Sequence, residues 1–355
     1  MKEENKQKDP VIDWVFVFII FSAFVLRLMD LTWPSHILQP DEMFSMKAAL
    51  QPTIGDLIKF VAVDTHPPLY FLVLRGWFKL VPVTFENAKM LSILFNVLNI
   101  ALTFRLALLW GNRKTALLAA LVMALSPWNI YWSHLARNHQ MLPPLFTAST
   151  LALFLWFKKD KKGFPAWYAI LSILMIQTNY LSFFILFTHG VIILWKCRKD
   201  FREALYPFLA IIISVMSYLP FLFTFTEHLT KGPMRVPFGQ HVVSPGLLFY
   251  HFLFFNLFTG NLGDLWYPPP HSWYMITTGG LVLSLLIIFA AKKIKDPVFW
   301  MLLVIPPVIT LITARILGTT MAERYLAYCI GPFAIMIAAG IRGVLNFHQK
   351  QIKKT

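Results

Sequence analysis

Long apolar runs recur along the whole chain and constrain its fold more than any other feature. Of its 355 residues, 57% are hydrophobic and only 14% are charged, with a mean hydropathy of +0.61. A run of about 20 apolar residues crosses a ~30 Å hydrocarbon core as a helix, because lipid offers the backbone no hydrogen-bond partners. The sequence therefore predicts an all-α polytopic membrane protein. Residues 1–355 are expected to form a single transmembrane domain without a soluble C-terminal domain.

The positions of the basic residues predict which ends of the helices face the cytoplasm. The net charge is +15, and lysine and arginine gather in short stretches between the apolar runs. Such clusters are typical of cytoplasmic loops and favour contact with anionic lipid. We therefore expect membrane lipids, and no nucleic acid, as partners. The clusters occupy residues 113–114, 158–162, 196–202, 292–295 and 342–354.

The same clusters set the number of spans. If residues 67–83 and 87–110 both crossed, the basic pair Arg113-Lys114 would face outside. The first of these segments is short and carries Arg75 and Lys79, which favours a helix lying in the membrane surface. Residues 245–259 are predicted to be juxtamembrane by the same test. About ten spans remain, with both termini cytoplasmic: 12–31, 88–110, 114–132, 139–157, 164–180, 181–195, 204–224, 273–291, 297–315 and 325–345.

This topology leaves two substantial outer regions, residues 32–86 and 225–272. The first contains an Asp-Glu pair about ten residues beyond the first span and a histidine followed by two prolines. Several cations from later helix ends reach the same boundary. We therefore predict a functional site on the outer face. The residues that meet there are Asp41, Glu42, Asp64, His66, Lys89, Arg137 and Arg324.

Arg27 lies near the outer end of the first span, together with Asp30. Its side chain could extend to the membrane interface, as long basic side chains do near helix ends. Alternatively, it faces inward toward the carboxylates of the first outer region. The second interpretation makes Arg27 a further candidate ligand for a donor.

These residue types suit chemistry on a lipid-linked sugar. Transfer from a polyprenyl phosphate needs a base for the acceptor hydroxyl and cations for the departing phosphate. Asp41 or Glu42 could be the base, and arginine is the best geometric match for phosphate oxygens. The histidines have no spacing typical of a metal site, so we expect no metal and no other cofactor.

Together these segments form a recognisable pattern. The chain resembles the C-type (GT-C) glycosyltransferases of the protein O-mannosyltransferase and aminoarabinose transferase superfamily (glycosyltransferase family 39-like), which take sugars from polyprenyl-phosphate donors. The resemblance covers essentially the whole chain, and its Asp-Glu and His-Pro-Pro elements are the specific parts. The matching segments are 40–42, 64–71, 88–92, 126–128, 136–137, 178–181, 323–326 and 331–332.

The resemblance implies that Asp41 is the catalytic base, with Glu42 beside it, and that the Asp64/His66 segment shapes the donor site. It also implies that the cation at position 89 meets the lipid phosphate, although relatives usually have arginine where Lys89 stands. Members of the superfamily generally invert the configuration at C1 without a metal.

We therefore expect a glycosyltransferase in a bacterial cytoplasmic membrane, with its site on the outer face and an acceptor that is a glycan, lipid or protein. A transporter or flippase of lipid-linked sugars is the alternative. It would need polar groups along a path through the bundle. A non-catalytic assembly subunit would not require Asp41.

Overall fold

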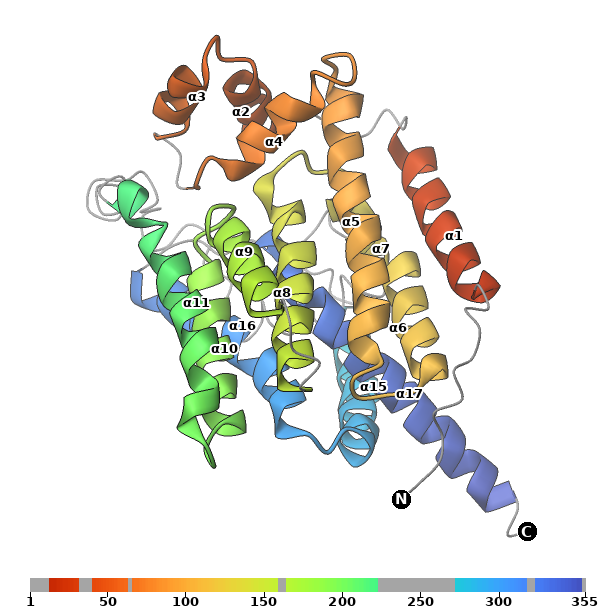
Figure 1. The fold of residues 1–355 in the computed structure, drawn as a ribbon. Helices are drawn as coiled ribbons and strands as arrows, with labels where there is room; N and C mark the ends of the chain where they lie inside the picture. The colour runs from red at the N-terminus through yellow and green to blue at the C-terminus, as the bar shows by residue number, and fades with distance from the viewer. Residues whose placement is uncertain are drawn as a thin grey trace.

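Figure 1 shows a computed structural model of the chain, in which a bundle of helices is covered at one end by three short helices and holds the end of its last helix at the other. The structure describes residues 13–31, 40–62, 66–158, 164–222, 272–317 and 323–352. All regular elements within these ranges are helices. The second predicted outer region, 225–272, lies outside them except for its last residue.

The helices follow one another in an up-and-down order. The first part of the chain contains α1 (Trp14–Leu31), α2 (Pro40–Ala49), α3 (Ile54–Val61), α4 (Leu69–Trp77), α5 (Phe85–Ala107), α6 (Arg113–Leu125) and α7 (Pro127–Ser133). The second contains η1 (Asn138–Gln140), α8 (Leu142–Phe157), α9 (Phe164–Ile176), α10 (Ser182–Lys196), η2 (Phe201–Ala204) and α11 (Leu205–Met216). The third contains α15 (Ser272–Lys293), α16 (Pro297–Leu317), η4 (Glu323–Cys329) and α17 (Ile330–Ile352).

The all-α multi-pass fold is confirmed, and each of the ten predicted spans falls on a described helix or pair of helices. By length and composition, three helices within the described residues can cross a membrane: α5, η1 with α8, and the helix from Tyr325 to Ile352. The pair α6 and α7, bent by 60°, would be a fourth. Four further spans fall on shorter apolar helices, in α1, α9, α10 and α16, and the last two fall on α11 and α15.

Three short helices, α2, α3 and α4, lie together at one end of the bundle, which we call the α2–α4 end (Figure 1). Helix α4 has nine residues, or about 14 Å, too short to cross the hydrocarbon core. It packs against α2 and α3 through a small apolar core that includes Leu57, Phe71 and Leu74. Its first amide, Leu69 N–H, donates to Gln177 O at 3.2 Å and joins it to the end of α9.

The long C-terminal helix α17 packs against α15, α6 and α5 in the largest apolar core of the protein. Glycines allow the closest of these approaches. A Cβ atom added at Gly340 would lie 2.5 Å from Leu286 O of α15, and one at Gly343 would lie 2.8 Å from the Cβ atom of Phe289. Small residues at helix contacts are typical of membrane bundles, because they let two backbones approach closely.

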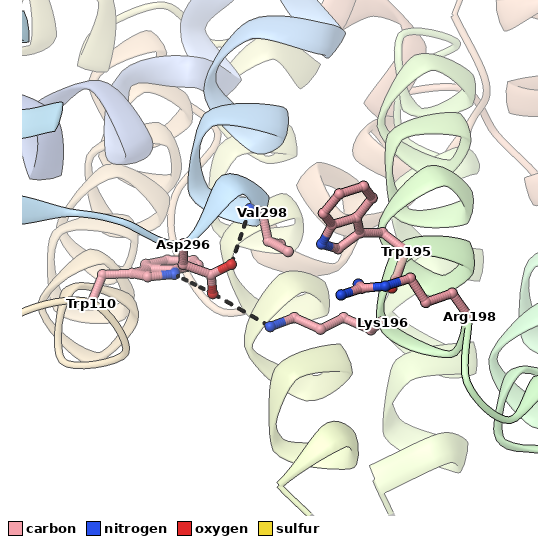
Figure 2. Close-up of polar contacts among 6 residues, drawn as sticks. All are labelled: Trp110, Trp195, Lys196, Arg198, Asp296 and Val298. Atoms are coloured by element: carbon pink, nitrogen blue, oxygen red, sulfur yellow. Dashed lines mark hydrogen bonds and ion pairs between the residues drawn. The ribbon is translucent and has the colours of Figure 1, made fainter.

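The end of the bundle opposite α2–α4 holds those residues of the basic clusters that the structure describes, and polar contacts join its turns (Figure 2). Asp296 accepts a hydrogen bond from Val298 N at 3.1 Å and so caps α16. Its carboxylate also accepts from Trp110 Nε1 at 3.2 Å and pairs with Lys196 Nζ at 3.4 Å. Three turns that are distant in sequence are thereby joined. Beside them Arg198 lies over the ring of Trp195, 4.6 Å from its centroid.

Candidate functional site

The Asp-Glu pair lies in the first turn of α2, directly after Pro40. Proline suits a helix start, and carboxylates are favoured there by the helix dipole. The two adjacent side chains have different surroundings: that of Asp41 is 36% exposed, whereas Glu42 is 3% exposed. Only Asp41 is therefore open enough to meet a substrate directly.

Glu42 ties α2 to the segment that follows α7. Its Oε1 atom accepts a hydrogen bond from Ala136 N at 3.1 Å. This amide belongs to the residue that precedes Arg137. A buried carboxylate that accepts a backbone hydrogen bond is a fixed structural link. From the sequence, either Asp41 or Glu42 could be the base. The contact with Ala136 favours a positioning role for Glu42.

Arg137, the residue after Ala136, lies opposite Asp41. Its Nη2 atom lies 4.0 Å from Asp41 Oδ1, and its side chain is 7% exposed. The guanidinium also lies 5.3 Å from the ring centroid of Phe44 in α2 and 5.7 Å from that of Phe71 in α4. Cations are attracted to aromatic faces at such distances. Two helices of the α2–α4 end therefore hold the charge of Arg137 beside the exposed carboxylate.

The hydroxyl of Tyr70 in α4 is buried close to these charges. Burial raises the pKa of Tyr70 above its ordinary value, with opposing contributions from the charges of Arg137 and Glu42. The hydroxyl therefore stays protonated at neutral pH. It is a neutral dipole beside two buried charges.

His66 lies in a cluster of rings that includes His139, two residues along the chain from Arg137. Its ring is stacked on Tyr180, with centroids 5.3 Å apart and planes inclined by 10°. The edge of His139 lies 5.2 Å away, and His139 in turn lies 5.2 Å from Tyr325. His139 Nδ1 accepts from Asn179 Nδ2 at 3.4 Å. Four segments that are distant in sequence thus meet in one ring cluster, in which His66 contacts His139 and Tyr180, and His139 contacts Tyr325.

Lys89 is buried in the first part of α5, with 7% exposure. In the described part of the chain its amino group has no carboxylate within ion-pair distance and no hydrogen-bond partner. Lys89 shares a helix face with Ser92, at a spacing of three residues. Ser92 Oγ donates to Leu135 O at 2.8 Å, in the segment that carries Arg137. This face of α5 therefore borders the site.

Arg27 is placed differently from both alternatives that the sequence left open. The residue is fully buried, so its side chain does not extend to the interface. Its guanidinium donates to Asn96 Oδ1 at 2.9 Å and to the carbonyls of Ala23, Met123 and Ala124 at 2.8, 3.3 and 3.3 Å. None of these partners is a carboxylate. A donor-binding role for Arg27 stays a prediction that these contacts do not support.

The structure thus pairs Asp41 with Arg137 and joins Glu42 to Ala136, the residue before Arg137. His66 contacts the same segment through His139, and the helix face of Lys89 contacts it through Ser92. Asp64 lies outside the described residues, as does the side chain of Arg324, so their roles stay predictions. Our sequence reasoning missed Phe44, His139, Asn96, Asn129 and Gln140. The signal for Asn96 was present, since Lys89, Ser92 and Asn96 repeat a polar residue at helical spacing within an apolar run.

No group of three histidine, cysteine, aspartate or glutamate side chains suited to a metal ion is found within the described residues. The cations at the site are side chains: the guanidinium of Arg137 and the ammonium of Lys89. Such groups can bind phosphate oxygens and stabilise negative charge. The expectation that no metal takes part stays a prediction.

Comparison with known proteins identifies the fold. Residues 65–223 match the model of the dolichyl-phosphate-mannose-protein mannosyltransferase family. No curated protein sequence matches the chain. Two similar solved structures are those of ArnT from Cupriavidus metallidurans in the apo state and bound to undecaprenyl phosphate. Their TM-scores are 0.57, with 14% and 13% identity over 93% and 94% of this chain.

A third is the archaeal oligosaccharyltransferase AglB from Archaeoglobus fulgidus in complex with an inhibitory peptide and a dolichol-phosphate. Its TM-score is 0.53, with 11% identity over 96% of this chain. The chain spans 59% to 60% of the length of the ArnT chains and 51% of that of AglB. The fold is that of the GT-C glycosyltransferases, as the sequence predicts, and the protein is a multi-pass integral membrane protein.

Proposed function

We propose that the chain is a membrane-embedded glycosyltransferase that moves a monosaccharide from a polyprenyl-phosphate donor to an acceptor hydroxyl. The observation that carries this proposal is the placement of Asp41, a partly exposed carboxylate, 4.0 Å from the buried cation Arg137. Lys89, a second buried cation, lies on the bordering face of α5. The names of the similar proteins support the donor class, since two of the three structures contain a polyprenyl phosphate.

In this reaction Asp41 acts as the general base. Its carboxylate takes the proton of the acceptor hydroxyl while the acceptor oxygen forms a bond to C1 of the sugar. The bond between C1 and the phosphate oxygen breaks, and the polyprenyl phosphate leaves with the electron pair. Attack from the side opposite the phosphate inverts the configuration at C1. A positioned base of this kind contributes about 10²–10⁴-fold to the rate.

The two buried cations take different parts in the proposed reaction. Lys89 binds the phosphate of the donor, because its ammonium has no carboxylate partner among the described residues. Arg137 orients the carboxylate of Asp41 and adds positive charge where the phosphate departs. Charge that develops in the transition state is stabilised most by cations that are already in place. The ring cluster around His66 borders the space where the sugar would lie.

We also propose that the α2–α4 end faces outward. The described basic clusters lie at the opposite end, and such clusters are typical of the cytoplasmic side. A cysteine introduced at Lys79, which is exposed, should react with a membrane-impermeant thiol reagent added to intact cells. A cysteine at Arg198 should react only with a permeant reagent. The opposite pattern would contradict the orientation. The native Cys197 and Cys329 are buried and would be replaced first.

The transfer reaction is tested with purified protein in lipid nanodiscs and a panel of radiolabelled polyprenyl-phosphate monosaccharides. We expect at least one donor to lose its sugar, to water or to an added acceptor, in the wild type but not in Asp41→Asn. Chelation with EDTA should leave this turnover unchanged. Glu86→Gln, which changes an exposed carboxylate in the first turn of α5, is the matched control. Equal sugar release by Asp41→Asn and wild type would contradict the proposal.

A further inference from the structure

Residues 134–140 form a buried connection between α7 and α8, and they carry Arg137. All seven residues are at most 6% exposed. Only three of them, Asn138 to Gln140, form a short 3-10 turn. Irregular backbone is tolerated at membrane depth only where the protein itself satisfies its polar groups. The contacts that do so therefore decide where the guanidinium of Arg137 lies.

Neighbouring helices hold this connection at points along its whole length. At its first half, His134 Nε2 donates to Arg27 O at 2.8 Å, and Leu135 O accepts from Ser92 Oγ at 2.8 Å. At its second half, Asn138 Nδ2 donates to Thr178 O at 3.0 Å. Gln140 Oε1 accepts from Asn96 Nδ2 at 3.3 Å. Together with the contact of Glu42, these bonds come from α1, α2, α5 and the end of α9.

Asn96 makes four hydrogen bonds within this network. Its Oδ1 atom accepts from Arg27 Nε at 2.9 Å and from Asn129 Nδ2 at 3.3 Å. Its Nδ2 atom donates to Asn129 Oδ1 at 2.8 Å and to Gln140 Oε1 at 3.3 Å. One side chain of α5 thereby joins α1, α7 and η1. All four residues are at most 4% exposed, so no bulk water replaces a lost partner.

The same network stabilises the break between α6 and α7. The carbonyls of Met123 and Ala124, at the end of α6, accept from the guanidinium of Arg27. Asn129 Nδ2 also donates to Met123 O, at 2.9 Å. The last carbonyls of a helix have no partner within the helix itself. Arg27 and Asn129 supply those partners where the bundle excludes water.

We propose that Asn96 is a positioning residue for Arg137. Through Gln140, Asn129 and Arg27 it fixes the 134–140 connection, and so holds the guanidinium of Arg137 opposite Asp41. Asn96 does not touch the substrate in this proposal and acts on the reaction only through Arg137. The catalytic consequence rests on the proposed function, whereas the fixing of the connection does not depend on it.

Hydrogen exchange tests whether Asn96 fixes the connection. In Asn96→Ala, the peptide that covers residues 134–140 should exchange about tenfold faster or more, because buried partners are left unsatisfied. Asn99→Ala is the matched control: Asn99 is also buried, three residues further along α5, and among the described residues it accepts only from Thr147, at 2.8 Å. Equal exchange in the two variants would overturn the proposal. If Asn96→Ala does not fold, Gln140→Met replaces it, with the same two outcomes.

A double-mutant cycle tests whether Asn96 acts through Arg137. The kcat/KM for the polyprenyl donor should fall about tenfold in Asn96→Ala, chiefly through kcat, and little in Asn99→Ala. In the Arg137→Met background, Asn96→Ala should cause no further loss, because residues that act as a unit are not additive. Additive losses would overturn the proposal. If the wild type transfers no sugar at all, the proposed function fails, and the exchange experiment alone decides whether Asn96 fixes the connection.

Discussion

The two ends of the bundle differ in how deeply their basic side chains are buried. At the α2–α4 end, the side chain of Arg137 is 7% exposed, and Glu42 and Lys89 are 3% and 7% exposed. At the opposite end, Arg113 is 63% exposed in its 2.6 Å pair with Asp13. Lys196 and Asp296 are about one-third exposed in their pair, 34% and 30%, and they join turns of the chain (Figure 2).

This difference separates exposed charges, which pair with one another, from buried charges, for which we propose a functional role. Exposed pairs contribute about 0–1 kcal/mol to stability, so their loss is tolerated. A buried charge costs several kcal/mol unless it is paired, and within a membrane such residues usually mark functional sites. Lys89 has no carboxylate partner among the described residues. Burying the charge of Lys89 therefore costs free energy of folding, and a functional role for this charge would explain why it is buried.

The largest effect is expected from Asp41→Asn. The change keeps the size of the side chain and most of its hydrogen bonding but removes the base, so kcat should fall by roughly 10²–10⁴-fold. Affinity for the polyprenyl donor should be largely kept, because Asp41 acts on the acceptor. Single-turnover transfer and donor binding are measured separately. Near-normal turnover would exclude Asp41 as the base and leave Asp64 as the next carboxylate to test.

The next largest losses of activity are expected from changes to the two buried cations, and the kinetics should distinguish their roles. Lys89→Met and Arg137→Met remove a charge but keep an apolar stem, and each should lower kcat/KM by about tenfold or more, at about 1.4 kcal/mol for each tenfold. For Lys89→Met the loss should include weaker donor binding, whereas for Arg137→Met it should lie mainly in kcat. Lys89→Arg should retain most activity, because it keeps the charge. Normal transfer by both Met variants would place the phosphate site elsewhere, with His66 as the first residue to examine.

A smaller effect is expected from Glu42→Gln, and it distinguishes the neighbouring carboxylates. The amide oxygen of glutamine can still accept from Ala136 N, so the link between α2 and the 134–140 connection should persist. Activity should fall by about tenfold or less, and Glu42→Ala should cost more because the amide then loses its partner. A loss in Glu42→Gln as large as that in Asp41→Asn would show that Glu42 is itself a base.

The sequence predicts much of this comparison but not all of it. Apolar run length and the positions of basic residues predict the spans and the short surface helix at residues 67–83, because both follow from the cost of exposing polar groups to lipid. The convergence of Asp41 with Arg137 was also predicted. The different burial of Asp41 and Glu42 could not be predicted from the sequence, because adjacent residues on a short helix give no periodic signal. The place of Arg27 could not be predicted for another reason: two of its partners are the carbonyls of Met123 and Ala124, which the break between α6 and α7 leaves without helical partners.

The smallest effect is expected from Lys196→Met at the opposite end. Lys196 and Asp296 are 34% and 30% exposed in their pair, and solvent screens such pairs, so the loss in stability should stay within about 1 kcal/mol. Asp296 keeps its bonds to Trp110 and Val298, and these still join α16 to the turn after α5. The melting temperature should fall slightly, less so at high salt, where the wild-type pair is already screened. The kcat/KM should match that of the wild type, because none of the contacts among the described residues links this pair to the α2–α4 end. A loss of activity as large as that of Lys89→Met would break the division between the two ends, and would mean that the opposite end controls the site through the helices between them.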